Sequence, residues 1–362
     1  MEIYMKIMFD HSIFEKQKFG GISRYFVNLL NSLRINKDLQ PKIFCQIYKN
    51  FYLKNVSKSH KKGFYFNREI PFTGNIIKLI NNLSFRYNYN KFKPDIYHQT
   101  YYENKKFKIS CPKFITVYDL YHEIYHKNKN YRPKKKALEN VDHIFTISNN
   151  TKNDLINLYS IDPNNITVSH LGHDHVQLNL DNNIKFDPFL LFVGSRKQYK
   201  NFYFFLKSIS LSKKILKDFN IIFFGGGNFN NEELKYISEL KISPGKIKNI
   251  QGSDEDLYSL YNSAAAFIFP SSHEGFGLPI IESMKAECPV VCSDIPVFRE
   301  IADGAAEFFN LNDNNNLVDA IENVIFSDAK QKRLIDSGKK RIENFSWDKC
   351  ADRTLSAYKK FI

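Results

Sequence analysis

Short apolar runs alternate with longer segments of helical spacing along the first half of the chain. Residues 23–33, 76–85 and 150–159 show the helical spacing. The apolar runs have the length of buried strands and lie at residues 4–9, 42–47, 95–98, 114–117, 143–147 and 166–170. Strands that alternate with helices predict βαβ units and therefore a parallel sheet.

The same alternation starts again after a polar segment, residues 176–188, which has the composition of a linker. Strands are predicted at residues 189–193, 220–224, 249–251, 266–269, 290–292 and 307–309. Helices are predicted after Asn201 and at residues 253–264, 278–285, 316–326, 329–343 and 347–361. A chain of 362 residues also exceeds one ordinary core, so the sequence predicts two α/β domains.

Composition narrows the cellular setting. The first residues lack the apolar core of a signal peptide, and no run approaches the roughly 20 apolar residues of a membrane-spanning helix. The five cysteines are scattered, which argues against a disulfide framework or a zinc site. We therefore expect a cytoplasmic protein without a bound metal.

The net charge of +14 is confined to one half of the chain. Residues 1–180 hold 28 Lys or Arg against 14 Asp or Glu, whereas the remaining residues hold 24 of each. Such asymmetry favours an anionic partner for the first domain, either nucleic acid or an anionic membrane surface. Simple solubility remains an alternative explanation.

Two glycine-containing loops follow predicted strands of the second half. Gly194 ends the strand at 189–193 and is followed by Arg196 and Lys200, just before a helix. Helix N-termini attract anions, and Arg and Lys add full charges there, so this loop is a candidate phosphate site. Gly225 opens a run of three glycines that would allow a ligand close to the backbone, although a plain turn would explain it too.

The segment PSSHEGFGLPIIE at residues 270–282 contains two glutamates eight positions apart. Glu274 lies in the glycine-containing loop that follows a strand, and Glu282 lies in the first or second turn of the next helix. Glu274 could contact a sugar hydroxyl and Glu282 a ribose diol. A simple charge near a helix N-terminus is the alternative for Glu282.

Polar residues also follow strands in the first half. Gly20 and Gly21 precede a helix and would let a phosphate or sugar lie against the backbone, or form a flexible turn. His98, Tyr118 and Asp119 stand at the ends of two strands. Together they suggest the wall of a cleft, although a lone histidine at a strand end is usually structural.

One acidic triplet resembles a metal-binding sequence but has another explanation. Asp254, Glu255 and Asp256 fit a D-x-D pattern that holds a metal-bound nucleotide in some transferases. They come directly after Ser253 and open a predicted helix, where acidic residues stabilise the first turn. We expect a helix cap here.

Taken together, these motifs resemble those of glycosyltransferase family four, and the resemblance covers almost the whole chain. Its strongest part runs over residues 254–300, where Glu274 and Glu282 match the family's E-x7-E element. Arg196 and Lys200 match its phosphate-binding stretch, and residues 20–25 look like a subgroup that makes surface polysaccharides, often mannosyl- or rhamnosyltransferases.

The resemblance implies the GT-B fold, with two Rossmann-like domains facing a cleft. Residues 1–178 would form the acceptor domain, completed by a last helix, residues 347–362, that crosses back to it. Residues 179–346 would form the nucleotide-sugar domain.

The resemblance also implies roles for individual residues. Arg196 and Lys200 would neutralise the diphosphate leaving group, Glu274 would lie near the transferred sugar, and Glu282 would hold the ribose. The donor would further be cradled by Gly20, Gly21, Gly194, Gly225, Gly275, Phe276, Gly277 and Leu278. His98, Tyr118 and Asp119 would line the acceptor side. No metal and no cofactor would be needed.

The chain departs from the family pattern at two positions. Tyr118 stands where the family often has histidine, which puts that histidine's role in doubt. Glu287 stands where a glycine usually follows the E-x7-E helix, so we expect a strained left-handed residue there.

The expected function is a retaining, metal-independent transfer of a hexose from a nucleotide-diphosphate sugar, with GDP-mannose as the subgroup-level candidate. The acceptor would be a growing, lipid-linked surface glycan, with the enzyme peripheral on the inner face of the cytoplasmic membrane. A nucleotide-sugar phosphorylase or epimerase on the same fold, a basic nucleic-acid-binding protein and an inactive homologue are the alternatives. Nucleic acid is not expected as a partner, since no binding motif for it is present.

Overall fold

A computed structural model describes residues 4–68, 73–103, 107–125, 132–173, 187–196 and 198–362. The chain folds as two compact units, residues 1–172 with 347–362 and residues 173–346, and each is described here by itself. The sequence places the boundary at 178/179, which lies in a stretch outside the described residues.

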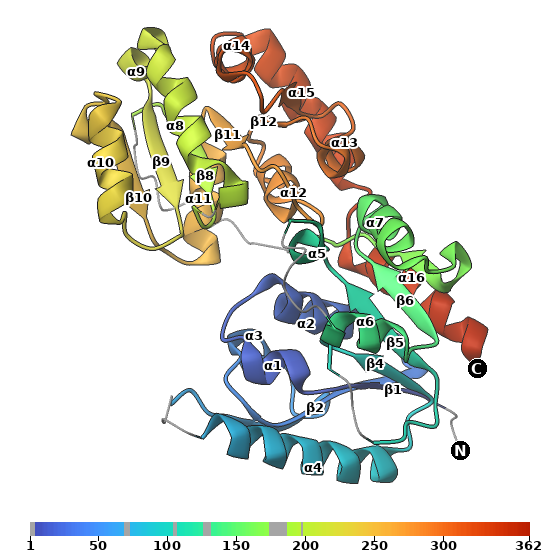
Figure 1. The fold of residues 1–362 in the computed structure, drawn as a ribbon. Coiled ribbons are helices and arrows are strands. Elements are labelled where there is room, and N and C mark those ends of the chain that lie inside the picture. Colours follow the sequence, from blue (N-terminus) through green and yellow to red (C-terminus); the bar gives the residue numbers. More distant parts are fainter. Residues whose placement is uncertain (1–3, 69–72, 104–106, 126–131, 174–186, 197) are drawn as a thin grey trace. The chain divides into compact units, whose positions relative to one another are not determined.

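Unit 1 is built on a parallel sheet whose described strands have the order β3-β2-β1-β4-β5-β6-β7 (Figure 1). The strands are β1 Met5–Phe9, β2 Leu39–Tyr48, β3 Lys61–Tyr65, β4 Ile96–Gln99, β5 Lys113–Val117, β6 His143–Thr146 and β7 Ile166–Val168. The helices are α1 Ser12–Lys16, α2 Gly21–Leu33, α3 Phe51–Lys54, α4 Gly74–Phe92, α5 Tyr121–Tyr125, α6 Arg132–Leu138, α7 Asn149–Tyr159 and α16 Trp347–Tyr358.

Unit 2 repeats this plan, with described strands in the order β10-β9-β8-β11-β12-β13, again all parallel. The strands are β8 Phe189–Val193, β9 Asn220–Phe224, β10 Ile247–Ile250, β11 Ala266–Phe269, β12 Val290–Ser293 and β13 Glu307–Phe309. The helices are α8 Phe202–Leu211, α9 Lys213–Asp218, α10 Asn231–Glu239, α11 Asp254–Ser263, α12 Leu278–Lys285, α13 Pro296–Ala302, α14 Asn314–Ile325 and α15 Asp328–Ile342.

The order of the strands locates where each unit can bind a ligand. In each sheet the chain first adds strands on one side of the initial strand and then crosses to the other side. Ligands of such open sheets bind outside the carboxyl ends of the strands at this switch point. The switch point lies between β1 and β4 in unit 1 and between β8 and β11 in unit 2. The predicted α/β class with two Rossmann-like domains is confirmed.

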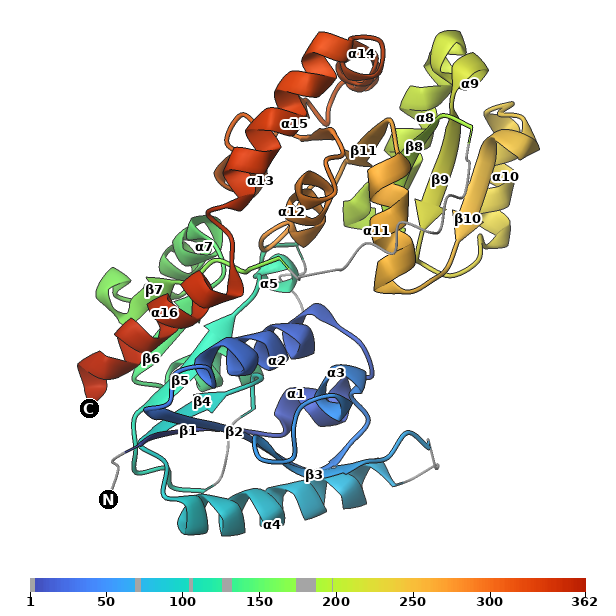
Figure 2. The ribbon, with the colours of Figure 1, turned by 180° about the vertical axis from the view of Figure 1, so that it is seen from behind.

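The end of the chain belongs to unit 1, although its sequence neighbours belong to unit 2. Helix α16 buries Cys350, Thr354 and Tyr358 against the first sheet and α2, as the red helix in Figure 2 shows beside α2 and β6. Ser169 donates to the carbonyl of Cys350 at 3.1 Å. The predicted return of the last helix to the first domain is therefore confirmed.

Candidate functional site

The switch point of unit 2 joins the loops that leave β8 and β11. Asn201 Nδ2 donates to the carbonyl of Pro270 at 2.8 Å, and Ser272 N donates to the carbonyl of Tyr199 at 2.8 Å. These bonds link the two loops directly at the carboxyl ends of neighbouring strands. The polar side chains that each loop carries are thereby held next to each other.

Lys200 and Glu274 meet at this point. Lys200 Nζ lies 2.6 Å from Glu274 Oε1, and the two side chains are only 11% and 17% exposed. The ammonium group also lies 4.8 Å from the ring centroid of Phe269, which adds a cation–π contact. Two residues 74 positions apart thus form a largely desolvated charged pair whose Lys could also contact an anion.

Two glycines without side chains lie at the strand ends next to this pair. Gly194 has φ +111°, and a Cβ there would lie 3.9 Å from Lys200 Nζ. Gly225, at the end of β9, packs against Gly194, and a Cβ added to it would lie 3.8 Å from the Cα of Gly194. The ends of β8 and β9 can therefore present bare backbone to a ligand beside Lys200.

Helix α12 starts at the same edge of the sheet. Gly277 is its N-cap in a left-handed conformation (φ +103°), and the first turn contains no acidic residue. The positive end of the helix dipole is therefore not compensated within its own first turn. Leu278 opens the helix and Glu282 stands in its second turn, both half-buried, whereas Phe276 is buried against Phe345. Gly275 lies half-buried in the preceding loop.

Arg196, which the sequence assigns to a phosphate, makes hydrogen bonds to other parts of unit 2 in this structure. Its Nε donates to Glu233 Oε1 at 2.7 Å, and its Nη atoms donate to carbonyls of Gly225, Gly226, Gly227 and Asn228. Glu233 is 5% exposed, and its carboxylate also caps helix α10. A buried carboxylate requires a counter-charge, which Arg196 supplies. Arg196 therefore holds the glycine loop, and its contacts do not include the Lys200–Glu274 pair. Glu233 was not among the site residues predicted from the sequence.

The predicted acceptor side of unit 1 needs correction for two residues. His98 is fully buried, with Nδ1 2.6 Å from Tyr358 Oη and Nε2 2.9 Å from Thr116 Oγ1. Burial lowers the pKa of His98 to about 3, so the ring is neutral. Tyr118 is buried edge-on against Tyr25, and its pKa is raised by burial. Both lie in the core because strands β4 and β5 are central in the sheet.

Asp119 lies in a half-buried loop, where its Oδ1 accepts a bond at 3.1 Å from the backbone N–H of Tyr121, the first residue of α5. Gly20 and Gly21 lie at the start of α2, and Gly20 is its N-cap. A Cβ on Gly21 would meet no atom within 4 Å. The fold of unit 1 therefore does not require glycine at position 21.

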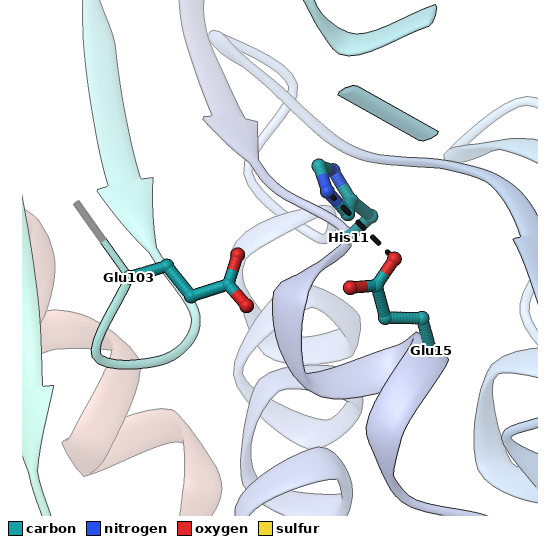
Figure 3. Close-up of side chains that lie close together, drawn as sticks. All are labelled: His11, Glu15 and Glu103. Atoms are coloured by element: carbon teal, nitrogen blue, oxygen red, sulfur yellow. Dashed lines mark ion pairs between the residues drawn. The ribbon is translucent and has the colours of Figure 1, made fainter. Parts of the chain in front are cut away.

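A polar cluster at the switch point of unit 1 was missed by the sequence reasoning. Figure 3 shows Glu103 reaching toward His11 and Glu15 at the start of α1; one ligand atom from each lies within 4.8 Å of the others. Lys16 Nζ lies 2.7 Å from Glu103 Oε1, and Lys78 Nζ lies 3.6 Å from the same atom. These cations compensate the carboxylates, so the cluster does not need a metal ion for charge balance.

Two local features of unit 2 agree with the sequence. The Asp254–Asp256 triplet is a helix cap, since Ser253 and Asp256 form a capping box at the start of α11. Glu287 is left-handed, with φ +58°. Both predictions are confirmed.

Comparison with known proteins gives matches over both units. Residues 19–177 match the model described as Glycosyltransferase Family 4, and residues 179–341 match the model described as Glycosyl transferases group 1. The chain is 25% identical to the O-antigen chain mannosyltransferase B of Escherichia coli, over 98% of this chain and 100% of the relative. It is 29% identical to the O-antigen chain mannosyltransferase RfbU of Salmonella typhimurium, over 52% of this chain and 53% of the relative.

Among solved structures, HepE of Anabaena in complex with UDP and glucose is similar with a TM-score of 0.76. The identity is 12%, over 99% of this chain and 100% of HepE, so the likeness concerns the fold. The fold of this chain is GT-B, as the sequence predicted. Among the described residues, no helix has the length and hydropathy needed to cross a membrane.

Proposed function

The chain belongs to the family-four glycosyltransferases, and from that membership we propose that it transfers mannose from GDP-mannose to a growing, lipid-linked surface glycan. The proposal for the sugar follows from the full-length similarity to an O-antigen chain mannosyltransferase. The proposed transfer retains the anomeric configuration and needs no metal ion.

The observation that carries this proposal is the Lys200–Glu274 pair at the switch point of unit 2. Its 2.6 Å contact holds one cation beside Gly194, which in turn packs against Gly225. A donor diphosphate would take Lys200 as its counter-ion, and Glu274 would then be available to a hydroxyl of the sugar. The uncompensated N-terminus of α12 would bind a second phosphate oxygen.

Catalysis would then be electrostatic. Charge develops on the leaving diphosphate as the bond to the sugar breaks, and Lys200 and the α12 dipole are preorganised for that charge. Arg196 would contribute by fixing the Gly225–Gly227 loop through its hydrogen bonds to the loop carbonyls. The acceptor would be held by unit 1, and Gly21 would keep the donor-side role predicted from the sequence, with open backbone at the start of α2.

The direct test is a donor screen in the presence of EDTA, with GDP-, UDP-, dTDP- and ADP-sugars and a lipid-linked glycan extract as the acceptor. We expect a mannosylated product from GDP-mannose, with the linkage configuration read by NMR. Absence of transfer from every donor would refute the proposed activity. A requirement for Mn²⁺ would refute metal independence, and an inverted linkage would refute retention.

A run without acceptor separates this function from a phosphorylase or epimerase on the same fold. A transferase should leave the donor largely intact under these conditions, whereas an epimerase would convert its sugar. A phosphorylase would consume the donor only when phosphate or diphosphate is added.

A further inference from the structure

Helix α4 of unit 1, Gly74–Phe92, exposes its apolar side chains rather than burying them. Five large apolar residues on it are 37–61% exposed: Ile76, Leu79, Ile80, Leu83 and Tyr87. At about 100° per residue, these positions fall within an arc of roughly 100°. They therefore form one continuous stripe along the helix, which we name the α4 stripe.

The opposite face of α4 contains asparagines where a core helix would have apolar residues. Asn81 is 1% exposed, accepts a bond from Ile47 N at 2.8 Å and donates to Glu15 Oε2 at 2.8 Å. Asn88 is 3% exposed and accepts a bond from Lys62 Nζ at 2.8 Å. Only Phe85 and Tyr89 add large buried side chains from this helix. Hydrogen bonds thus attach α4 to the sheet, while most of its apolar surface faces outward.

The charged residues on and beside α4 indicate which kind of partner would bind this surface. Helix α4 contains Lys78, Arg86 and Lys91 and no acidic residue. Lys62 on the edge strand β3 lies 5.6 Å from the ring centroid of Tyr87 and so adds a cation at the stripe. An exposed apolar stripe that is flanked by cations and includes an aromatic residue suits an anionic membrane surface, because apolar contact and cation–phosphate attraction both contribute to binding there.

A second copy of this chain fits the stripe less well. An isologous contact would bring two copies of the same cationic surface together, because both subunits use the same patch. Like charges opposed across an interface disfavour association. No such conflict arises with an anionic lipid surface.

We propose that the α4 stripe docks this protein onto an anionic phospholipid surface, with α4 parallel to that surface. Ile76, Leu79, Ile80, Leu83 and Tyr87 would enter the boundary between headgroups and acyl chains. Lys62, Arg86 and Lys91 would pair with lipid phosphates. The inference deepens the proposed function and rests on it, since the docked unit is the one proposed to hold a lipid-linked acceptor.

The test uses flotation of the full-length protein with vesicles of phosphatidylcholine, with and without phosphatidylglycerol. Wild-type protein should float with the anionic vesicles at about 0.1 M salt and much less near 1 M, where screening shortens to about 3 Å. The double variant Leu79→Glu/Leu83→Glu should lower the partition coefficient at least about tenfold, because it replaces apolar contact with repulsion. Both leucines are about 60% exposed, so the fold should persist.

The matched control is Leu211→Glu/Leu234→Glu in unit 2, where the leucines are 53% and 51% exposed. This control should float like the wild type. Equal flotation of the stripe variant and wild type, equal loss in both variants, or no flotation with anionic vesicles would each overturn the proposal. A wild-type dimer that the stripe variant converts to monomer, seen by sedimentation velocity, would assign the stripe to self-association instead.

A second readout separates this proposal from the proposed function. Transfer from GDP-mannose to a water-soluble glycan acceptor should be equal in the wild type, the stripe variant and the control when vesicles are absent. Flotation without transfer to either this acceptor or the lipid-linked glycan extract would support the docking surface and refute the transferase proposal. Transfer by a protein that does not float with anionic vesicles would support the transferase proposal and refute the docking surface.

Discussion

At the scale of the residue, the structure separates two basic groups that are close in sequence. Lys200 pairs with Glu274 across two loops, whereas Arg196 is committed to Glu233 and the glycine-loop carbonyls. Their side chains therefore differ in what they can offer a ligand. Lys200 can exchange one carboxylate for a phosphate, while Arg196 would have to give up several hydrogen bonds.

Replacing Lys200 with Ala should lower the rate of sugar transfer by about 100- to 1,000-fold, the usual effect of removing one preorganised charge donor. Lys207→Ala is the matched control, because Lys207 is exposed on the adjacent helix α8. Arg196→Ala should lower both the transfer rate and the melting temperature, since it frees the buried carboxylate of Glu233. Unchanged turnover in Lys200→Ala would remove this residue from the leaving-group role.

Glu282 tests whether the two glutamates act as an acid–base pair. Glu282→Gln keeps a hydrogen-bond acceptor but removes the charge, so we expect a higher KM for the donor and an unaltered shape of the pH–rate profile. Steady-state kinetics of both proteins over a range of pH would measure this. A limb of the profile that disappears in the variant would instead indicate proton transfer by Glu282.

At the scale of the element, helix α12 ends in an arrangement that normally uses glycine. Cys288 N donates to the Ser283 carbonyl at 3.0 Å and Glu287 N donates to the Met284 carbonyl at 3.1 Å, which is the Schellman pattern. The residue in the left-handed position is Glu287 (φ +58°). Helix α12 therefore ends with the hydrogen bonds of a Schellman motif, but a non-glycine residue in the left-handed position adds backbone strain.

Replacing Glu287 with Gly should stabilise the protein by about 0.5–1 kcal/mol, because the relief of left-handed strain exceeds the added entropy of the unfolded chain. Thermal unfolding should shift upward by about 1–4 °C. Lys339→Ala is the control for the lost ion pair, whose 2.9 Å contact is about half exposed and contributes little. A lower melting temperature in Glu287→Gly than in the control would contradict the strain argument.

At the scale of the whole molecule, the last helix closes the core of unit 1. Tyr358 of α16 contacts His98 of β4, 260 positions earlier in the chain. His98 is therefore a point where the end of the chain is attached to the first sheet. Its neutral ring also makes this attachment sensitive to acid.

Lowering the pH from 7 to 5 should destabilise unit 1. In the unfolded chain His98 binds a proton below its ordinary pKa of 6.5, whereas burial keeps the folded-state pKa at about 3. Stability is therefore lost as the pH falls from 6.5 toward 3, by about 2 kcal/mol for this residue at pH 5. Denaturant unfolding at both pH values should show a smaller loss in His98→Gln, which does not titrate. Equal losses in both proteins would show that His98 is not the proton acceptor.

Several features follow from the sequence alone, because they depend on local patterns. The period of the apolar residues predicted both parallel sheets, and Ser253 with Asp256 predicted the cap of α11. The glycine expected at position 287 predicted a left-handed residue there. The motifs resemble those of the family, and that resemblance implies the GT-B fold; the two family matches and the fold similarity confirm both.

The tertiary structure alone decided which side chains meet. Strand order brings Lys200 next to Glu274, which is 74 positions away, and Arg196 pairs with Glu233, which is 37 positions away. His98 on β4 and Tyr118 directly after β5 are buried because both strands are central in the sheet. The exposed stripe of α4 could not be predicted from the sequence either. Helical spacing shows that one face of a helix is apolar, but it does not show which face packs against the sheet. Long-range packing is specified by the sum of many weak contacts, so a short motif cannot reveal it.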